Sequence, residues 1–232
     1  MKNTIIAKRK SIRKYQATEL DASTLARIQE KITELTPLYA DIPYKITISN
    51  QVRRAFGINA PHYLLFYTEQ NAKAAQNIGF LGQQLDLYFS AHSIGACWVG
   101  MAKSELSTES KLPFAIAIAF GFPNEPLHRD ISQFKRKTLP EISSGSDPRL
   151  NAARLAPSGI NAQGWFFIAE QGNIHCYYKK QNALLGRFLG DLGQMDLGIA
   201  LWHIASESDT FSFVTVENPP AQKGFLYAGT VV

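Results

Sequence analysis

The chain has 232 residues, 45% of them hydrophobic and 19% charged, and its formal net charge is +5. This length suits one or two globular domains, and no apolar run reaches the roughly 18–20 residues that a membrane span requires. The two cysteines are far apart, the five histidines form no H-x-x-x-H pair, and Walker-type, G-x-G-x-x-G and G-x-S-x-G motifs are absent, which excludes several common metal, nucleotide and hydrolase classes.

The first part of the chain predicts two helices and three strands. Asp21 is a candidate N-cap because apolar residues recur at helical spacing after it, and Pro37 ends that helix. Alternating or continuous runs of branched and aromatic residues predict the strands. In chain order, we expect a helix over 21–35, strands over 44–49 and 62–68, a long helix over 71–93 and a strand over 112–120.

A segment rich in Ser and Gly, Ser143–Pro148, predicts a linker before the second part of the chain. After it, we expect a short helix over 149–155, strands over 165–169 and 174–178, a long helix over about 182–205 and strands over 211–216 and 225–232. Strands and helices do not alternate as steady βαβ units. The order therefore predicts an α+β fold with a mixed or antiparallel central sheet packed by helices.

Two short sequences are repeated along the chain. Gly57-Ile-Asn-Ala60 and Gly159-Ile-Asn-Ala162 each precede a predicted strand, and Gln84-Leu-Asp-Leu87 in the first long helix is similar to Gln194-Met-Asp-Leu197 in the second. Two matches in the same order favour internal duplication over chance. We therefore expect two pseudo-repeated halves, over 1–142 and 149–232, joined by the linker over 143–148.

A basic segment near the N-terminus is the first candidate for binding chemistry. In Arg9-Lys-Ser-Ile-Arg-Lys-Tyr15, the residues Arg9, Ser11 and Arg13 alternate, so an extended backbone would place them on one face. Two guanidinium groups and a hydroxyl arranged in this way would suit a phosphate, because arginine forms bidentate, charge-assisted bonds. The alternative from the residues alone is a solvated basic arm.

The second candidate is the loop Ala156-Pro-Ser-Gly-Ile-Asn-Ala-Gln-Gly-Trp165. Small and amide residues at this point would bring backbone N–H groups, a hydroxyl and two side-chain amides against a flat polar ring. Pro, Ser, Gly and Asn are also ordinary turn residues, so a plain turn is the alternative interpretation.

These two segments resemble motifs of the nitroreductase-like, FMN-dependent flavoproteins. R-K-S-I-R-K-Y is similar to the family's R-R-S-I-R-x-F/Y, and A-P-S-G-I-N-A-Q-G-W is similar to A-P-S-x-x-N-x-Q-P-W, with Gly164 in place of the usual proline. Ser93–Gly100 and Phe134–Ile142 resemble two further family segments. The matches span residues 9 to about 205.

The resemblance implies a set of cofactor-binding residues. Arg9 would face the FMN phosphate, Arg13 would tune the flavin from the pyrimidine edge, and Trp98, Val99 and Gly100 would lie along the ring near N5. No side chain is implied as a catalytic nucleophile, because flavin N5 carries the hydride. The implied residues are Arg9, Lys10, Ser11, Arg13, Trp98, Val99, Gly100, Lys135, Arg136, Lys137, Pro157, Ser158, Gly159, Asn161 and Gln163.

The resemblance also implies an activity. NADH or NADPH would reduce the flavin, which would then reduce a small acceptor such as a nitroaromatic or a quinone. Alternatives are a flavoprotein of the same fold that acts as a dehydrogenase, a dehalogenase or a flavin-fragmenting enzyme. A basic nucleic-acid-binding module that uses the clusters over 8–14 and 135–137 is a more distant alternative, because neither cluster has interleaved aromatic residues.

The order of the motifs departs from the family pattern. The A-P-S loop usually follows the arginine motif closely and reaches the flavin of a partner subunit, whereas Ser158 lies far beyond Ser11 here. We therefore expect the second half to supply the loop in cis, and we expect its first-half counterpart over 56–62 to be degenerate. This predicts one FMN per chain and a competent monomer, although a homodimer is also compatible. Because the N-terminus turns basic before a signal-like apolar stretch, we expect a soluble cytoplasmic protein with no nucleic-acid or membrane partner.

Overall fold

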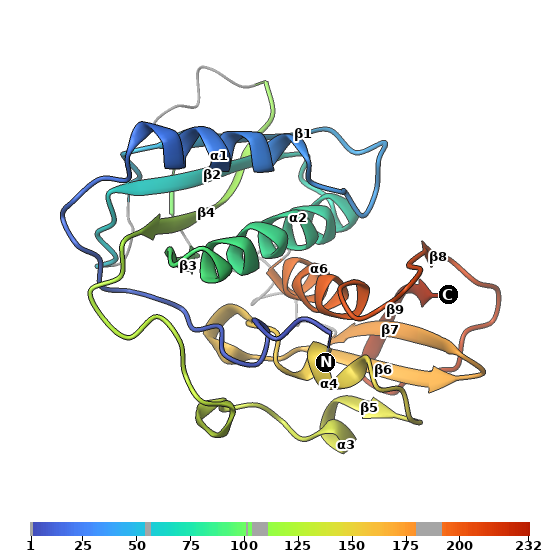
Figure 1. Ribbon diagram of the computed structural model, residues 1–232. Helices are drawn as coiled ribbons and strands as arrows, with labels where there is room; N and C mark the ends of the chain where they lie inside the picture. Colours follow the sequence, from blue (N-terminus) through green and yellow to red (C-terminus); the bar gives the residue numbers. More distant parts are fainter. Residues whose placement is uncertain (1, 54–56, 101, 104–110, 180–191) are drawn as a thin grey trace.

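The computed structural model describes residues 2–53, 57–100, 102–103, 111–179 and 192–232 (Figure 1). It has two β-sheets, and two long helices lie between them. The predicted α+β class is confirmed, but the strands form two separate sheets instead of one central sheet. The first ten residues of the helix predicted over 182–205 lie outside the described residues.

The first sheet has the strand order β1-β2-β4-β3, and all its neighbours are antiparallel. Its strands are β1 (Tyr44–Ser49), β2 (His62–Thr68), β3 (Gly95–Val99) and β4 (Phe114–Gly121). The helices α1 (Ala22–Thr33) and α2 (Ala72–Ala91) pack on one face and enclose the larger part of the core with it. Asp21 caps α1 as predicted, because its carboxylate accepts a hydrogen bond from the N–H of Thr24. We did not expect β3 as a separate strand.

The second sheet has the order β5-β6-β7-β9-β8. Its strands are β5 (Ser143–Ser144), β6 (Trp165–Glu170), β7 (Asn173–Lys179), β8 (Phe213–Val214) and β9 (Phe225–Val231). β5 pairs parallel with β6 and takes up the first two residues of the segment predicted as a linker over 143–148, whose role as a linker stays a prediction. The helices α4 (Leu150–Arg154) and α6 (Leu192–Ala205) pack with this sheet. The short helix α3 (Leu139–Ile142) and the 3₁₀ turns η1 (Ile131–Gln133) and η2 (Gly159–Asn161) complete the described elements.

The two sheets share one topology. The order β1-β2-β4-β3 corresponds to β6-β7-β9-β8, and the irregularity between Phe66 and Tyr67 in β2 has a counterpart between Cys176 and Tyr177 in β7. The repeated Gly-Ile-Asn-Ala does not follow this correspondence, because Gly57 precedes β2 whereas Gly159 precedes β6, the equivalent of β1. The sequence alignment of the halves was therefore wrong in register, and duplication itself stays a prediction.

The helices α2 and α6 cross at close range in the centre of the molecule (Figure 1). A Cβ on Gly79 would overlap the carbonyl oxygen of Met195, and a Cβ on Gly198 would overlap the carbonyl oxygen of Gln76. Each glycine thus meets the residue three positions before the other glycine, which is the relation of a local two-fold axis. Gly79 and Gly198 are therefore structural equivalents.

No helix in the described part of the chain has the length and apolar character needed to cross a bilayer.

Candidate functional site

An open pocket of about 680 Å³ lies where three segments distant in sequence meet. Its size is within the usual range of small-molecule and cofactor sites. The lining residues are Arg9, Lys10, Ser11, Arg13, Pro126, His128, Arg129, Gln133, Lys135, Arg136, Pro157, Ser158, Ile160 and Asn161. Among the residues that the structure describes, no group of three or more His, Cys, Asp and Glu side chains is placed to hold a metal ion.

The N-terminal segment enters the pocket as an extended chain. Ser11 forms a β-bridge with Ala96 in β3, and Tyr15 forms another with Pro123. The hydroxyl of Tyr15 lies 2.6 Å from the carbonyl oxygen of Ile12 and 3.1 Å from that of Ala119, which fixes the end of the segment. In an extended chain alternate side chains share a face, and the structure brings the side chains of residues 9, 11 and 13 to the pocket.

Arg9 is held by a buried ion pair on the inner side of the pocket. Its Nε donates to Oδ2 of Asp86 in α2 at 2.5 Å, and its Nη2 donates to Oγ of Ser11 at 2.8 Å. Both charged side chains are at most 2% exposed. Burial raises the pKa of Asp86, and the guanidinium of Arg9 opposes that rise. The ion pair therefore fixes the orientation of the Arg9 side chain before any ligand binds.

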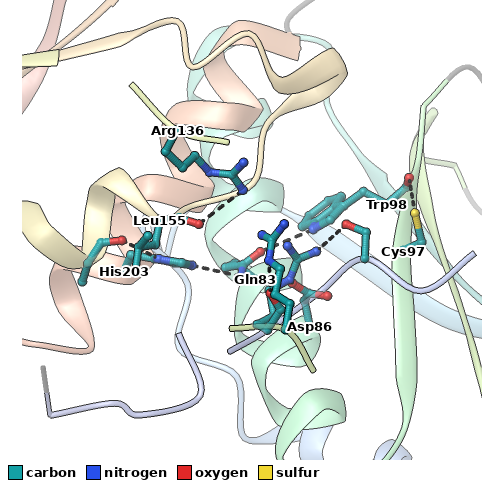
Figure 2. Close-up of polar contacts among 11 residues, drawn as sticks. Gln83, Asp86, Cys97, Trp98, Arg136, Leu155 and His203 are labelled. Carbon is teal, nitrogen blue, oxygen red and sulfur yellow. Dashed lines mark hydrogen bonds and ion pairs between the residues drawn. The ribbon is translucent and has the colours of Figure 1, made fainter. Parts of the chain in front are cut away.

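A buried chain of polar side chains continues from Asp86 into the second half (Figure 2). The Nε2 of Gln83 lies 3.1 Å from Nε2 of His203, whose Nδ1 lies 2.8 Å from the carbonyl oxygen of Ala152. Burial lowers the pKa of His203 to about 3, so the ring is neutral and Nδ1 carries the proton that reaches the carbonyl. The indole of Trp98 donates to Oε1 of Gln83 at 3.4 Å. These contacts couple α2 to α6 beneath the pocket.

Two further arginines form a cationic wall around Phe134. The guanidinium carbon of Arg129 lies 3.6 Å from the ring centroid of Phe134, and that of Arg136 lies 5.6 Å from it. Burial, with neighbouring guanidinium groups, lowers the pKa of Arg129 and of Arg136 to about 10. The Nε of Arg136 is buried and has no hydrogen-bond partner among the described residues. A ligand group with several anionic oxygens could balance the two positive charges and accept hydrogen bonds from the guanidinium groups.

The loop after α4 forms a second wall, which is hydrogen-bonded to the cationic wall beside it. The Oγ of Ser158 accepts from the N–H of Gln163 at 2.9 Å, and the Nζ of Lys137 donates to the carbonyl oxygen of Gln163 at 3.0 Å. The side chain of Asn161 bridges the wall and the loop, because its Oδ1 accepts from Arg136 at 2.7 Å and its Nδ2 donates to the carbonyl of Lys135 at 2.9 Å.

Nine of the implied cofactor residues line the pocket, and six do not. Lys137 and Gln163 hold the loop instead, because the N–H of Lys137 donates to Oε1 of Gln163 at 2.8 Å. Gly159 faces α6. The nine lining residues are Arg9, Lys10, Ser11, Arg13, Lys135, Arg136, Pro157, Ser158 and Asn161.

The segment Trp98–Gly100 also lies outside the pocket lining. Trp98 stacks on Phe66 with 6.2 Å between ring centroids, and Val99 is 2% exposed in the core of the first sheet. Their placement along a flavin ring was expected from the family resemblance alone. Both residues belong to β3 and pack against its neighbours, and their contact with a flavin ring stays a prediction.

Five lining residues are not predicted from the sequence, namely Pro126, His128, Arg129, Gln133 and Ile160. Four of them lie in the connection after β4, and Arg129 is the most important because it completes the cationic wall. The nearby basic run over 135–137 was a usable signal, since another arginine occurs only a few residues before it. Ile160 was inside the motif but was treated as a spacer.

The chain is similar to proteins of one kind. The family profile described as "Putative TM nitroreductase" matches residues 3–208. A solved structure from Thermotoga maritima, described as a "putative nitroreductase", has 19% identity to this chain and a TM-score of 0.64. The match covers 99% of this chain and 91% of that protein. A nitroreductase family protein from Clostridium difficile 630 has 14% identity and a TM-score of 0.50, covering 62% of this chain and 96% of its own. A nitroreductase with bound FMN from Desulfitobacterium hafniense has 12% identity and a TM-score of 0.47, covering 59% of this chain and 98% of its own. No curated protein matches the chain.

Proposed function

Because this chain belongs to the nitroreductase family and has the nitroreductase fold, we propose that it is an FMN-dependent oxidoreductase that uses NADH or NADPH to reduce a small electron-poor acceptor. Nitroaromatics and quinones are the acceptor classes that we propose. Fold alone does not determine function, so the proposal depends on the fit between the pocket and the cofactor.

The cationic wall carries the proposal. Arg129 and Arg136 both have a lowered pKa because burial and like charges disfavour their charged forms, and Nε of Arg136 has no partner among the described residues. A phosphate dianion would relieve the repulsion between the two guanidinium groups and accept a hydrogen bond from Nε of Arg136. Arginine is the side chain best suited to such contacts. The phosphate of FMN fits this wall, and Arg9, Lys135 and Arg136 would hold it with Arg129.

The rest of the pocket suits a polar ring. Ser158 and Asn161 lie on the loop side, and Arg13 lies on the N-terminal segment. When bound, FMN supplies the hydride-transfer chemistry that the side chains themselves lack. The protein would orient the ring between the two walls, and the charge of Arg13 would favour negative charge on the reduced ring.

The arrangement favours a small anion over nucleic acid as the ligand. The two basic clusters converge on one concave pocket, where Lys10 is already paired with Glu125 at 2.6 Å. The arginine segment and the loop with Ser158 line the same pocket of one chain. We therefore propose one FMN per chain, bound by a monomer without a loop from a partner.

Arg129→Ala should weaken FMN binding by about ten- to a hundredfold, because each charge-assisted bond to a phosphate contributes about 1.5–3 kcal/mol. Quenching of flavin fluorescence on titration with apoprotein measures the dissociation constant. Lys14→Ala is the matched control, because Lys14 is exposed and does not line the pocket. Equal affinities for the Arg129 variant and the parent would contradict the phosphate assignment.

Arg13→Ala should make the bound flavin harder to reduce, because a cation near the pyrimidine edge stabilises the negative charge of the reduced form. The reduction potential should fall, and reduction by NADH or NADPH should be slower. Spectroelectrochemical titration of the parent and of the variant measures the potentials directly. Identical potentials would remove Arg13 from the ring.

A further inference from the structure

The loop that forms one wall of the pocket has a strained backbone. Ile160, Asn161 and Gln163 have φ values of 47°, 59° and 47°, in the left-handed region that non-glycine residues seldom adopt. Such a conformation is unfavourable for a residue with a Cβ and persists only where neighbouring groups hold it. The loop therefore depends on its outside contacts for its shape.

One of these contacts comes from the centre of the molecule. The Oδ1 of Asp196 in α6 accepts a hydrogen bond from the N–H of Gly159 at 2.9 Å, directly beneath the strained residues. Asp196 is 8% exposed and lies behind the loop, outside the pocket lining. The other side-chain contacts of the loop described above come from residues 135–137 or from the loop itself. Asp196 is therefore the link between the loop and α6.

In the part of the chain that the structure describes, this carboxyl group has no cationic partner. Within the described ranges, no lysine, arginine or histidine forms an ion pair with Asp196, and its N–H partner from Gly159 is the one polar contact that stabilises its charge. The ionisable residues on α6 itself and on the elements packed against it do not pair with it either. These are His203 on α6, Lys73, Asp86 and Tyr88 on α2, Arg154 on α4, Glu170 on β6, and His175, Cys176, Tyr177, Tyr178 and Lys179 on β7.

The equivalent position on α2 shows that the contact does not require a carboxylate. Asn77 precedes Gly79 by two residues, as Asp196 precedes Gly198. Its Oδ1 accepts from the N–H groups of Leu38 and Tyr39 at 2.8 and 3.2 Å. Those residues follow Pro37 as Ser158 and Gly159 follow Pro157. In the first half, therefore, a neutral amide accepts the equivalent backbone hydrogen bonds. The ionisable group is present only beneath the ligand loop.

We propose that Asp196 is a proton-linked positioning residue: its neutral carboxyl lets the loop close over it and complete the pocket, and its ionisation loosens the loop and weakens the binding of an anionic ligand. The inference rests on the proposed function only for the identity of that ligand as FMN.

The direction of the pH dependence of loop closure follows from the burial of the Asp196 carboxyl group. Burial raises the pKa of Asp196 from 3.8 to about 7 when the loop is closed, and the bond from Gly159 opposes that rise. With the loop open, water would reach the carboxyl and return its pKa toward the ordinary value. Closure is then fully favoured below about pH 4, loses stability as the pH rises toward 7, and changes no further above that. Repulsion between an ionised Asp196 and a phosphate acts in the same direction.

The first experiment needs no cofactor. In ¹H–¹⁵N spectra of the ligand-free protein, the amide of Gly159 should shift with pH as its partner ionises, with a midpoint above the ordinary carboxyl range and no higher than about 7. The Gly159 amide of D196N should show no such titration, and the amide of the exposed Gly224, directly before β9, is the internal control in both proteins. A Gly159 amide that does not titrate in the parent would overturn the proposal.

The second experiment measures FMN affinity from about pH 5 to pH 8 in the parent, in D196N and in the exposed control Asp41→Asn. The second ionisation of the phosphate, with a pKa of about 6, affects all three equally. Relative to D196N, the parent should bind FMN about equally at pH 5 and about tenfold more weakly at pH 8. A constant ratio would overturn the link to binding. If FMN binds none of the proteins while the Gly159 amide titrates, the proposed function fails and the coupling of Asp196 to the loop stands.

Discussion

Asp86→Ala should lower the free energy of unfolding by about 3–5 kcal/mol, because it leaves the guanidinium of Arg9 buried without a counter-charge. Arg9 and Asp86 are each at most 2% exposed, and the pair is 2.5 Å apart. Water cannot replace the lost carboxylate without opening the contact between the N-terminal segment and α2. Urea denaturation followed by circular dichroism measures the loss.

Two comparisons separate the buried charge from other effects of the substitution. Glu34→Gln breaks the exposed pair with Lys31 and should change stability by less than about 0.5 kcal/mol. Combining Asp86→Leu with Arg9→Met removes both charges and should recover most of the stability, since apolar replacements of a buried pair are often tolerated. A loss below about 1 kcal/mol for Asp86→Ala would mean that Arg9 finds another partner.

Gly198→Ala should destabilise the protein by about 3 kcal/mol or more, although alanine is the better helix former. The added Cβ would overlap the backbone carbonyl of Gln76 in α2, and a backbone atom cannot turn aside as a side chain does. The helices would have to separate, and both cores would lose packing with them. Gly79→Ala should have a similar effect, because it meets Met195 in the same way.

Gly164→Ala is the control for this substitution. Its added Cβ would lie 3.8 Å from Cβ of Lys179, an ordinary van der Waals contact, so the change in stability should stay within about 0.5 kcal/mol. Thermal or urea unfolding of the two variants side by side gives the comparison. If Gly198→Ala is as mild as Gly164→Ala, the two helices are free to slide past each other.

Local sequence patterns predicted most elements of the fold. The strands over 44–49 and 62–68 have the predicted bounds, because alternation or continuous burial marks both ends. The two-residue strand β5 was beyond such patterns, since pairing with a neighbour defines it, whereas β8 lies inside the strand predicted over 211–216. The alignment of the two halves was also wrong in register, because the shared tetrapeptide Gly-Ile-Asn-Ala is only a local similarity. The equivalence of Gly79 and Gly198 becomes visible only in the structure, where α2 and α6 cross.

Residues of the candidate site that belong to a sequence motif were predicted, whereas residues that only the folding of the chain brings to the site were missed. The motifs identified Arg9 and Ser158, although they did not reveal that Asp86 holds Arg9 from another helix. Arg129 belongs to no motif, and its place in the wall depends on the path of the connection after β4. Trp98 was assigned to the ring by analogy, and its packing on Phe66 follows from sheet geometry that the motif does not encode.

The wide sequence spacing of the pocket segments also has a consequence for biosynthesis. Arg9 would leave the ribosome well before Asp86, and Ser158 would follow later still, so the pocket is an assembly of high contact order. Until the second half has been translated, the arginines of the first half lack the opposite wall and the helix α6 that packs against α2. Flavin capture would therefore be a late, post-translational event that marks a fully folded chain, and truncated products would stay colourless.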